Sequence, residues 1–166
     1  MASYNGISMK AYKTFRDHEG CEIAQANLYI GNKKIGFWSQ DAWGGPDIID
    51  LDAKYDIRKL EECCKERGMD VEFTMWQLSR MTEDEREWKK SGWKRMFVAD
   101  DGYHMFMVGV KDPNATTSDI LNIQQVRNYI DENFFKDTNS HVFRIVDEST
   151  VNDDKWPITI EDIKRS

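Results

Sequence analysis

The sequence predicts a single domain of the α+β class, in which a mainly antiparallel sheet built from two β-hairpins packs against two main helices plus one short helix. Three observations predict this class. Two pairs of β-rich segments are each joined by a tight turn signal, the helical segments are amphipathic, and hairpins dominate over β-α-β alternation. The chain has 166 residues, 40% hydrophobic and 12% aromatic, which is enough for the core of one domain.

The first hairpin is predicted from alternation and a turn. In residues 22–30 every second side chain from Ala24 onward is apolar, which is typical of a strand with one buried face. A Gly-Asn turn at residues 31–32 follows, and residues 34–39 return as the second strand. A weaker alternation predicts another strand over residues 9–15.

A loop and three further elements come next. Residues 41–47 hold two glycines and a proline, which stop regular structure. We expect the first helix to be capped by Asp52 and to end at Gly68. Residues 71–78 place alternate apolar side chains together and predict a strand. A short helix over residues 82–92 has acidic side chains in its first turn and lysines in its last.

The second hairpin has the clearest signal in the chain. Residues 93–99 and 103–110 are β-rich, and the Asp-Gly pair at 101–102 between them is a strong turn signal. A long helix follows, with one apolar stripe made of Ile120, Ile123, Val126, Ile130 and Phe134. Residues 141–146 predict one more strand, and residues 158–160 a last one.

Charge and composition exclude several classes of protein. The chain has 23 basic and 30 acidic residues, a formal net charge of -7, so we expect no broad phosphate-binding face and no direct nucleic-acid binding. It has no membrane-length apolar run and no leader pattern, so we expect a cytoplasmic protein with no membrane partner. Its three cysteines favour a reducing compartment. We expect residues 1–8 to be frayed or a remnant of expression.

Patterns that would indicate catalysis are weak. The chain lacks Gly-x-Ser-x-Gly, His-Glu-x-x-His and phosphate-loop motifs. Its best acidic cluster could hold Mg²⁺ beside a flexible loop, and consists of Asp41, Asp47, Asp50 and Asp52. The same acids can be helix caps or the solvated face of an edge strand. We therefore predict no catalytic residue, no metal ligand and no cofactor.

Aromatic and acidic side chains supply the candidates for partner binding. They are Trp43, Glu83, Asp84, Glu85, Trp88, Asp153 and Asp154. A loop Trp between glycines can anchor an interface, or fold back over its own core. Acidic runs can occupy a basic channel of a target protein, or can form a solvated face that keeps the domain soluble.

Residues 26–46 (ANLYIGNKKIGFWSQDAWGGP) combine an apolar strand, a Lys-Lys turn, a return strand with Ile-Gly and an Asp-x-x-Gly-Gly loop before a helix. This segment, about an eighth of the chain, resembles small uncharacterised proteins of phages and other mobile elements. The match is carried by Ala26, Leu28, Ile30, Lys33, Lys34, Ile35, Gly36, Asp41, Gly44 and Gly45, whereas Trp43 and Pro46 depart from the pattern. The resemblance implies an inhibitor of host defence, of the anti-CRISPR type, that acts by binding.

We therefore expect a non-enzymatic binding protein of the host bacterial cytoplasm. It would inhibit a defence nuclease, such as a CRISPR effector, by occupying the basic surface on which that nuclease binds nucleic acid. The acids would match the basic residues of the target, and Trp43 would be the apolar anchor. Two alternatives stay open: a metal-assisted hydrolase of nucleotides or nucleic acid that uses the four aspartates, and a small-ligand binding domain with an aromatic pocket between sheet and helix.

Overall fold

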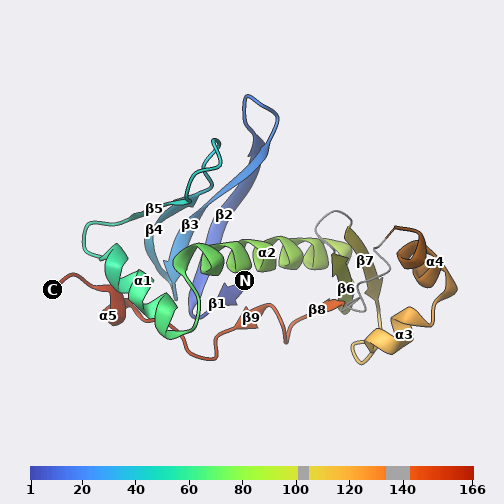
Figure 1. Cartoon of the computed structure of the whole chain (residues 1–166). Coiled ribbons are helices and arrows are strands. Elements are labelled where there is room, and N and C mark those ends of the chain that lie inside the picture. Colours follow the sequence, from blue (N-terminus) through green and yellow to red (C-terminus); the bar gives the residue numbers. More distant parts are fainter. Residues whose placement is uncertain (101–104, 134–142) are drawn as a thin grey trace. The chain divides into compact units, whose positions relative to one another are not determined.

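The computed structural model describes residues 1–100, 105–133 and 143–166 (Figure 1). The chain divides into two compact units, each with its own sheet. Unit 1 contains Met1–Glu83 and Val151–Ser166, and unit 2 contains Asp84–Thr150. Nearly all strand pairs are antiparallel, so the predicted α+β class with mainly antiparallel pairing is confirmed. The single domain stays a prediction, and each unit is described by itself.

The sheet of unit 1 has six strands in the order β5-β4-β3-β2-β1-β9. Their bounds are Ser3–Tyr4 (β1), Ile7–Arg16 (β2), Glu22–Ile30 (β3), Lys33–Ser39 (β4), Ile48–Leu51 (β5) and Asn152–Asp153 (β9). The predicted hairpin is confirmed as β3 and β4, which place Ala26 opposite Trp38. The strand predicted over residues 9–15 is part of β2.

A β-bulge in β2 decides which side chains face the core. Ala11 has a φ of 52°, in the left-handed region, and the register against β3 shifts between Lys10 and Lys13. Lys10 pairs with Asn27 and Lys13 pairs with Gln25, two residues apart on the same face of β3. Both lysines therefore lie on the face away from the core, whereas Tyr12 between them is buried.

Helix α1 runs from Ile57 to Glu66. Its N-cap is Asp56, whose carboxylate accepts a hydrogen bond from the N–H of Arg58 at 3.0 Å. The predicted cap at Asp52 is wrong, because that residue directly follows β5 and donates its N–H to the carbonyl of Ile35. The predicted end at Gly68 is confirmed by a φ of 82° beyond the last turn.

Helix α2 is continuous over 21 residues, Val71–Ser91. The strand predicted over residues 71–78 is wrong, and the short helix predicted over residues 82–92 is the second half of α2. The helix begins after Asp70, whose carboxylate accepts the N–H of Phe73 at 2.7 Å. The buried residues of its first half recur at helical spacing: Thr74, Met75, Leu78, Ser79, Met81 and Thr82.

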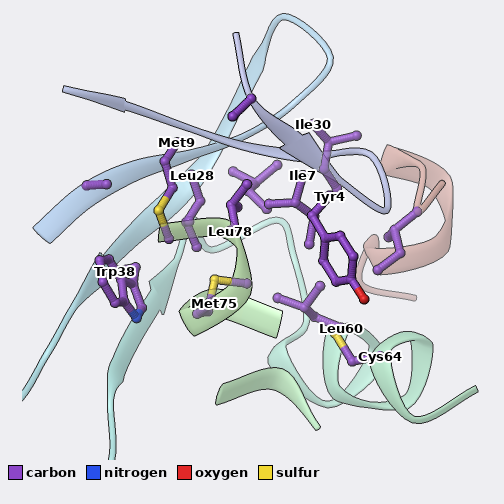
Figure 2. Close-up of a cluster of buried hydrophobic side chains, with 14 of the residues drawn as sticks. Tyr4, Ile7, Met9, Leu28, Ile30, Trp38, Leu60, Cys64, Met75 and Leu78 are labelled. Atoms are coloured by element: carbon purple, nitrogen blue, oxygen red, sulfur yellow. The ribbon is translucent and has the colours of Figure 1, made fainter. Parts of the chain in front are cut away.

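The core of unit 1 lies between these helices and one face of the sheet (Figure 2). Leu60 and Cys64 from α1 and Met75 and Leu78 from α2 belong to the same cluster as the inward strand residues. Those strand residues include Ile7, Met9, Ala24, Ala26, Leu28, Ile30, Ile35 and Trp38. Because Trp38 is fully buried, its indole N–H needs a partner inside the protein.

The N-terminal residues are part of the sheet. Residues 1–8 form β1 and the start of β2, and Ala2, Tyr4 and Ile7 are buried. The expectation that they fray is therefore wrong. Strand β1 is short, but it is held on both sides, antiparallel to β2 and parallel to β9.

The C-terminal segment is also packed, but not as predicted. Residues 158–160 do not form the expected strand; Ile158 is buried and donates its N–H to the carbonyl of Asn5 at 2.7 Å. Thr159 then starts the short helix α5, Ile160–Ile163, in a capping box with Asp162. The β-branched run that predicted a strand is interrupted by this cap.

Among the described residues of unit 2, three strands form a sheet in the order β7-β6-β8. They are Arg95–Asp100 (β6), Met105–Val110 (β7) and Arg144–Val146 (β8). The second predicted hairpin is confirmed by the antiparallel pairing of β6 and β7, whereas its Asp-Gly turn lies outside the described residues. The strand predicted over residues 141–146 is confirmed for its described part, β8.

Two helices replace the predicted long one in unit 2. Helix α3 covers Thr117–Leu121 and starts in a capping box between Thr116 and Asp119, and α4 covers Gln124–Asn133. The break lets the predicted stripe reach the core at Ile120, Val126 and Ile130, while Ile123 is exposed. Phe134 lies outside the described residues.

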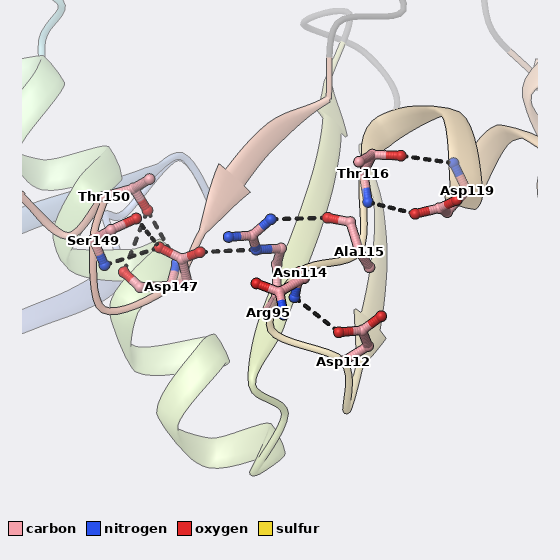
Figure 3. Close-up of polar contacts among 9 residues, drawn as sticks. All are labelled: Arg95, Asp112, Asn114, Ala115, Thr116, Asp119, Asp147, Ser149 and Thr150. Carbon is pink, nitrogen blue, oxygen red and sulfur yellow. Dashed lines mark hydrogen bonds and ion pairs between the residues drawn. The ribbon is translucent and has the colours of Figure 1, made fainter.

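A buried carboxylate ties the end of β8 to β6 (Figure 3). Asp147 accepts hydrogen bonds from the N–H and hydroxyl of Ser149, at 2.9 and 2.6 Å, and from Nε of Arg95 at 2.8 Å. Arg95 also donates to the carbonyl of Ala115 at 2.8 Å, so one guanidinium joins two loops of unit 2.

Within the described residues, no helix is both long and apolar enough to cross a bilayer.

Candidate functional site

The loop that follows β4 is organised around one carboxylate. Asp41 accepts hydrogen bonds from the N–H of Gly45 at 2.9 Å and of Trp43 at 3.2 Å, and its carbonyl accepts the N–H of Gly44. Gly44 has a φ of 74°, which suits glycine, and a Cβ on Gly45 would overlap the carboxylate of Asp41. The loop is therefore a compact turn and not a flexible connection.

Trp43 projects from this turn. The residue is 73% exposed, more than any other large hydrophobic residue among those described. One ring contact holds it: the imidazole of His18 lies 4.7 Å away, centroid to centroid, tilted by 53°. His18 belongs to the turn between β2 and β3, where the carboxylate of Asp17 accepts the N–H groups of Glu19 and Cys21.

Two other exposed tryptophans in unit 1 each pack against a guanidinium, a contact that Trp43 does not make with any described residue. The guanidinium of Arg67 lies 4.4 Å from the ring of Trp156, and that of Arg80 lies 4.7 Å from the ring of Trp76. Cation–π packing of this kind covers one face of each indole. Trp76 is 46% exposed, so this contact with Arg80 lies at the surface of α2.

Two of the acids predicted to bind a partner are buried in unit 2. Asp84 is bound by the guanidinium of Arg144, and Glu85 forms an ion pair with Lys89 at 3.4 Å. Trp88 is half-buried on the same helix, and its indole N–H has no hydrogen-bond partner among the described residues. The carboxylates of Asp84 and Glu85 are therefore already paired with basic side chains inside unit 2.

The remaining predicted acids lie in unit 1 and are more accessible. Glu83 is exposed and accepts the hydroxyl of Tyr12 at 2.6 Å. Asp154 is exposed and accepts the N–H of Gly6 at 2.7 Å, and Asp153 is the last residue of β9. No hydrogen bond, ion pair or ring contact of the described residues joins Trp43 to any of these acids.

The four aspartates proposed for a metal do not converge. Asp41 closes the turn after β4, and Asp47 accepts the indole N–H of Trp38 at 2.9 Å. Asp50 and Asp52 are exposed, and no group of three or more possible metal ligands exists among the described residues. Burial raises the pKa of Asp47, with a further rise from the charge of Glu72, against the opposing hydrogen bond from Trp38.

A cavity of about 410 Å³ lies elsewhere in unit 1. It is lined by Met1, Ser3, Gly6, Ser8, Ile30, Gly31, Asp154, Pro157, Ile158, Thr159 and Ile160. None of these side chains is aromatic and none comes from α1 or α2. The cavity is therefore not the aromatic pocket between sheet and helix that the small-ligand alternative requires.

The candidate site is thus the end of unit 1 at which Trp43, His18 and Asp41 meet. Sequence analysis identified Trp43, considered Asp41 as a possible Mg²⁺ ligand and as part of the Asp-x-x-Gly-Gly loop, and gave His18 no role. The Asp-x-x-Gly-Gly spacing does signal a turn closed by an aspartate. The contact between His18 and Trp43 joins two turns that are distant in the sequence, so no pattern of neighbouring residues predicts it. No family model, no curated protein and no solved structure matches the chain.

Proposed function

We propose that the chain is a non-enzymatic binding protein that docks onto a protein partner through the end of unit 1 marked by Trp43. The observation that carries this proposal is a tryptophan that is 73% exposed on a turn closed by hydrogen bonds to Asp41. Trp is the most favoured interface anchor, and anchors dominate the binding free energy.

The fixed turn makes Trp43 a better anchor than a tryptophan on a loose loop. Ordering a flexible loop on binding costs free energy that a preorganised turn has already spent in folding. Full burial of a large aromatic side chain contributes on the order of 2–3 kcal/mol. The turn therefore supports a partner with an apolar pocket at the centre of the interface.

The partner proposed is a bacterial defence nuclease, such as a CRISPR effector, inhibited at its basic nucleic-acid-binding surface. The turn that presents Trp43 lies inside residues 26–46, the segment that resembles proteins of phages and mobile elements. The net charge of -7 and the exposed carboxylates of Glu83 and Asp154 support a basic partner. Asp84 and Glu85 are bound inside the chain, so they add little to this argument.

The test is inhibition of DNA cleavage by a panel of purified CRISPR effector nucleases. Wild-type protein is expected to inhibit at least one of them, and Trp43→Ala is expected to weaken that inhibition by at least tenfold, about 1.4 kcal/mol. Trp156→Ala is the matched control, because that indole is also exposed but already packs on Arg67. Equal inhibition by both variants would remove Trp43 from the interface.

Binding to the inhibited nuclease is then measured at two salt concentrations. If carboxylates meet a basic surface, association slows as salt rises, whereas the loss caused by Trp43→Ala stays nearly constant. Absence of inhibition and of binding across the panel would overturn the proposed target class.

A further inference from the structure

The face of the unit 1 sheet that points away from the helices has its own chemistry. We call it the outer face and define it by register on β2, β3, β4 and β5. Its members are Ser8, Lys10, Lys13, Phe15, Ile23, Gln25, Asn27, Tyr29, Lys34, Phe37, Ser39, Ile48 and Asp50. None of them belongs to the core cluster of unit 1.

The outer face is locally basic in an acidic protein. Its charged members are Lys10, Lys13, Lys34 and Asp50, so it holds three basic side chains and one acidic one, although the whole chain carries a net charge of -7. None of the ion pairs found among the described residues includes one of these lysines. A face with unpaired cations fits an anionic ligand.

Aromatic rings and amides lie on the same face as the lysines. Phe15 is 43% exposed, and Tyr29 and Phe37 are partly exposed on the neighbouring strands β3 and β4. The ammonium of Lys10 lies 4.3 Å from the centre of the Tyr29 ring. Asn27, opposite Phe37 on the same face, adds hydrogen-bonding groups between the rings.

We propose that the outer face binds single-stranded nucleic acid. Sheet faces that bind unpaired strands stack bases on aromatic side chains and neutralise phosphates with nearby cations. Phe37, Tyr29 and Phe15 are the stacking rings here, and Lys10, Lys13 and Lys34 meet the phosphates. Duplex is excluded as the preferred ligand, because its base faces are stacked inside the helix and cannot reach the rings.

The net charge argued against nucleic-acid binding only as an average over the chain. The outer face differs from this average, because the bulge at Ala11 brings both Lys10 and Lys13 to it. The proposal does not depend on the Trp43 end or on any protein partner.

The experiment is fluorescence anisotropy of labelled 15-residue oligothymidine and oligouridine, with a duplex of equal length, titrated with the whole protein. Three phosphate contacts predict a log–log salt slope of about -2 for a single strand. Tighter binding of oligouridine or of oligothymidine identifies RNA or DNA as the source of the strand. Duplex bound as tightly as both single strands would overturn the proposal.

Adjacent lysines provide a matched control. Lys34 pairs with Tyr29 on the outer face, whereas Lys33 pairs with Ile30 on the face that carries the core. Lys34→Gln is expected to reduce the salt slope by about 0.7, and Lys33→Gln is expected to leave it unchanged. Equal effects of the two substitutions would show nonspecific attraction and would overturn the proposal.

The rings are tested with Phe37→Ala, which is expected to weaken single-strand binding about tenfold at constant salt slope. Circular dichroism shows whether this variant is folded, and Phe15→Ala, at a more exposed position, replaces it if it is not. Trp43→Ala is expected to bind the oligonucleotides like wild type, so this proposal and the proposed function fail separately. No binding by wild type at about 100 µM protein in low salt, the weak end of sequence-independent binding, would overturn the proposal.

Discussion

The carboxylate of Asp84 accepts two hydrogen bonds from the guanidinium of Arg144, from Nε at 2.7 Å and from Nη2 at 2.9 Å. The two residues are 60 positions apart in the chain, and their side chains are only 10% and 23% exposed. Asp100 lies 3.6 Å from the same guanidinium. Burial opposes the charge of Arg144, but Asp84 and Asp100 outweigh it and raise the pKa of Arg144. Asp84 thus holds β8 to helix α2 within unit 2.

Asp84→Ala is expected to lower the free energy of unfolding by about 3 kcal/mol, because it leaves a largely buried guanidinium without its bidentate partner. Urea denaturation measures the change. Glu87→Ala, an exposed acid on the same helix, is the control and is expected to change stability by less than about 0.5 kcal/mol. Equal values for the two variants would contradict a structural role for Asp84.

Asp147→Asn is expected to destabilise the protein near neutral pH and not in acid. Burial alone raises the pKa of Asp147, but hydrogen bonds from Ser149 and the charge of Arg95 outweigh it, so the folded pKa is lowered. The stability contributed by this carboxylate is therefore present above its unfolded pKa and is lost as pH falls through the folded value.

The deficit of Asp147→Asn is expected to be about 2 kcal/mol at pH 7. It should shrink below about pH 4, where wild type loses the same charge. Thermal unfolding across this range measures it, with the exposed neighbour substituted as Glu148→Gln for control. A deficit that stays constant with pH would show that charge is not the cause.

Asp47→Asn is expected to maintain or raise stability at pH 7, whereas Asp147→Asn lowers it. The folded pKa of Asp47 is raised, first by burial, so ionisation of this group weakens the folded state as pH rises through that value. Asparagine keeps an acceptor for the indole N–H of Trp38 and carries no charge. The variant should therefore equal or exceed wild type in melting temperature at pH 7, and this advantage should vanish in acid.

Asp47→Ala is the companion variant, because it removes both the charge and the acceptor. It is expected to be less stable than Asp47→Asn at every pH, since the buried indole N–H of Trp38 loses its partner. If Asp47→Asn were as destabilised as Asp47→Ala at pH 7, charge burial would not be the dominant effect at this site.

Local patterns predicted the hairpins but not helix α2. Residues 71–78 fit a strand because Val71, Phe73 and Met75 alternate, and eight residues do not separate a period of two from a period of 3.6. The cap at Asp70 favours the helix, and Leu78 joins Met75 in the core only at helical spacing. The cost is that Phe73 is left 46% exposed.

Tertiary contacts limited what could be predicted of the candidate sites. The turn that presents Trp43 follows from neighbouring residues, since glycines and an aspartate form it locally. The contact with His18 depends on two turns meeting, and the partner of Asp84 is distant in the chain. The residues of the outer face could not be predicted from the sequence because of the bulge at Ala11. A positive φ at a non-glycine residue reverses the strand alternation and has no sequence signal.

Gly109→Ala is expected to reveal a close contact across the second hairpin. A Cβ at Gly109 in β7 would overlap the ring of Trp93, which lies two residues before the hairpin strand β6. Forcing the ring out of place is expected to cost about 1–3 kcal/mol in the free energy of unfolding.

Gly109→Ala combined with Trp93→Ala should cost no more than Trp93→Ala alone, because alanine suits a strand better than glycine once the ring is gone. Urea denaturation of wild type, both single variants and the double variant gives the coupling free energy, expected to be at least about 1 kcal/mol. Additive effects would mean that the ring does not lie over Gly109.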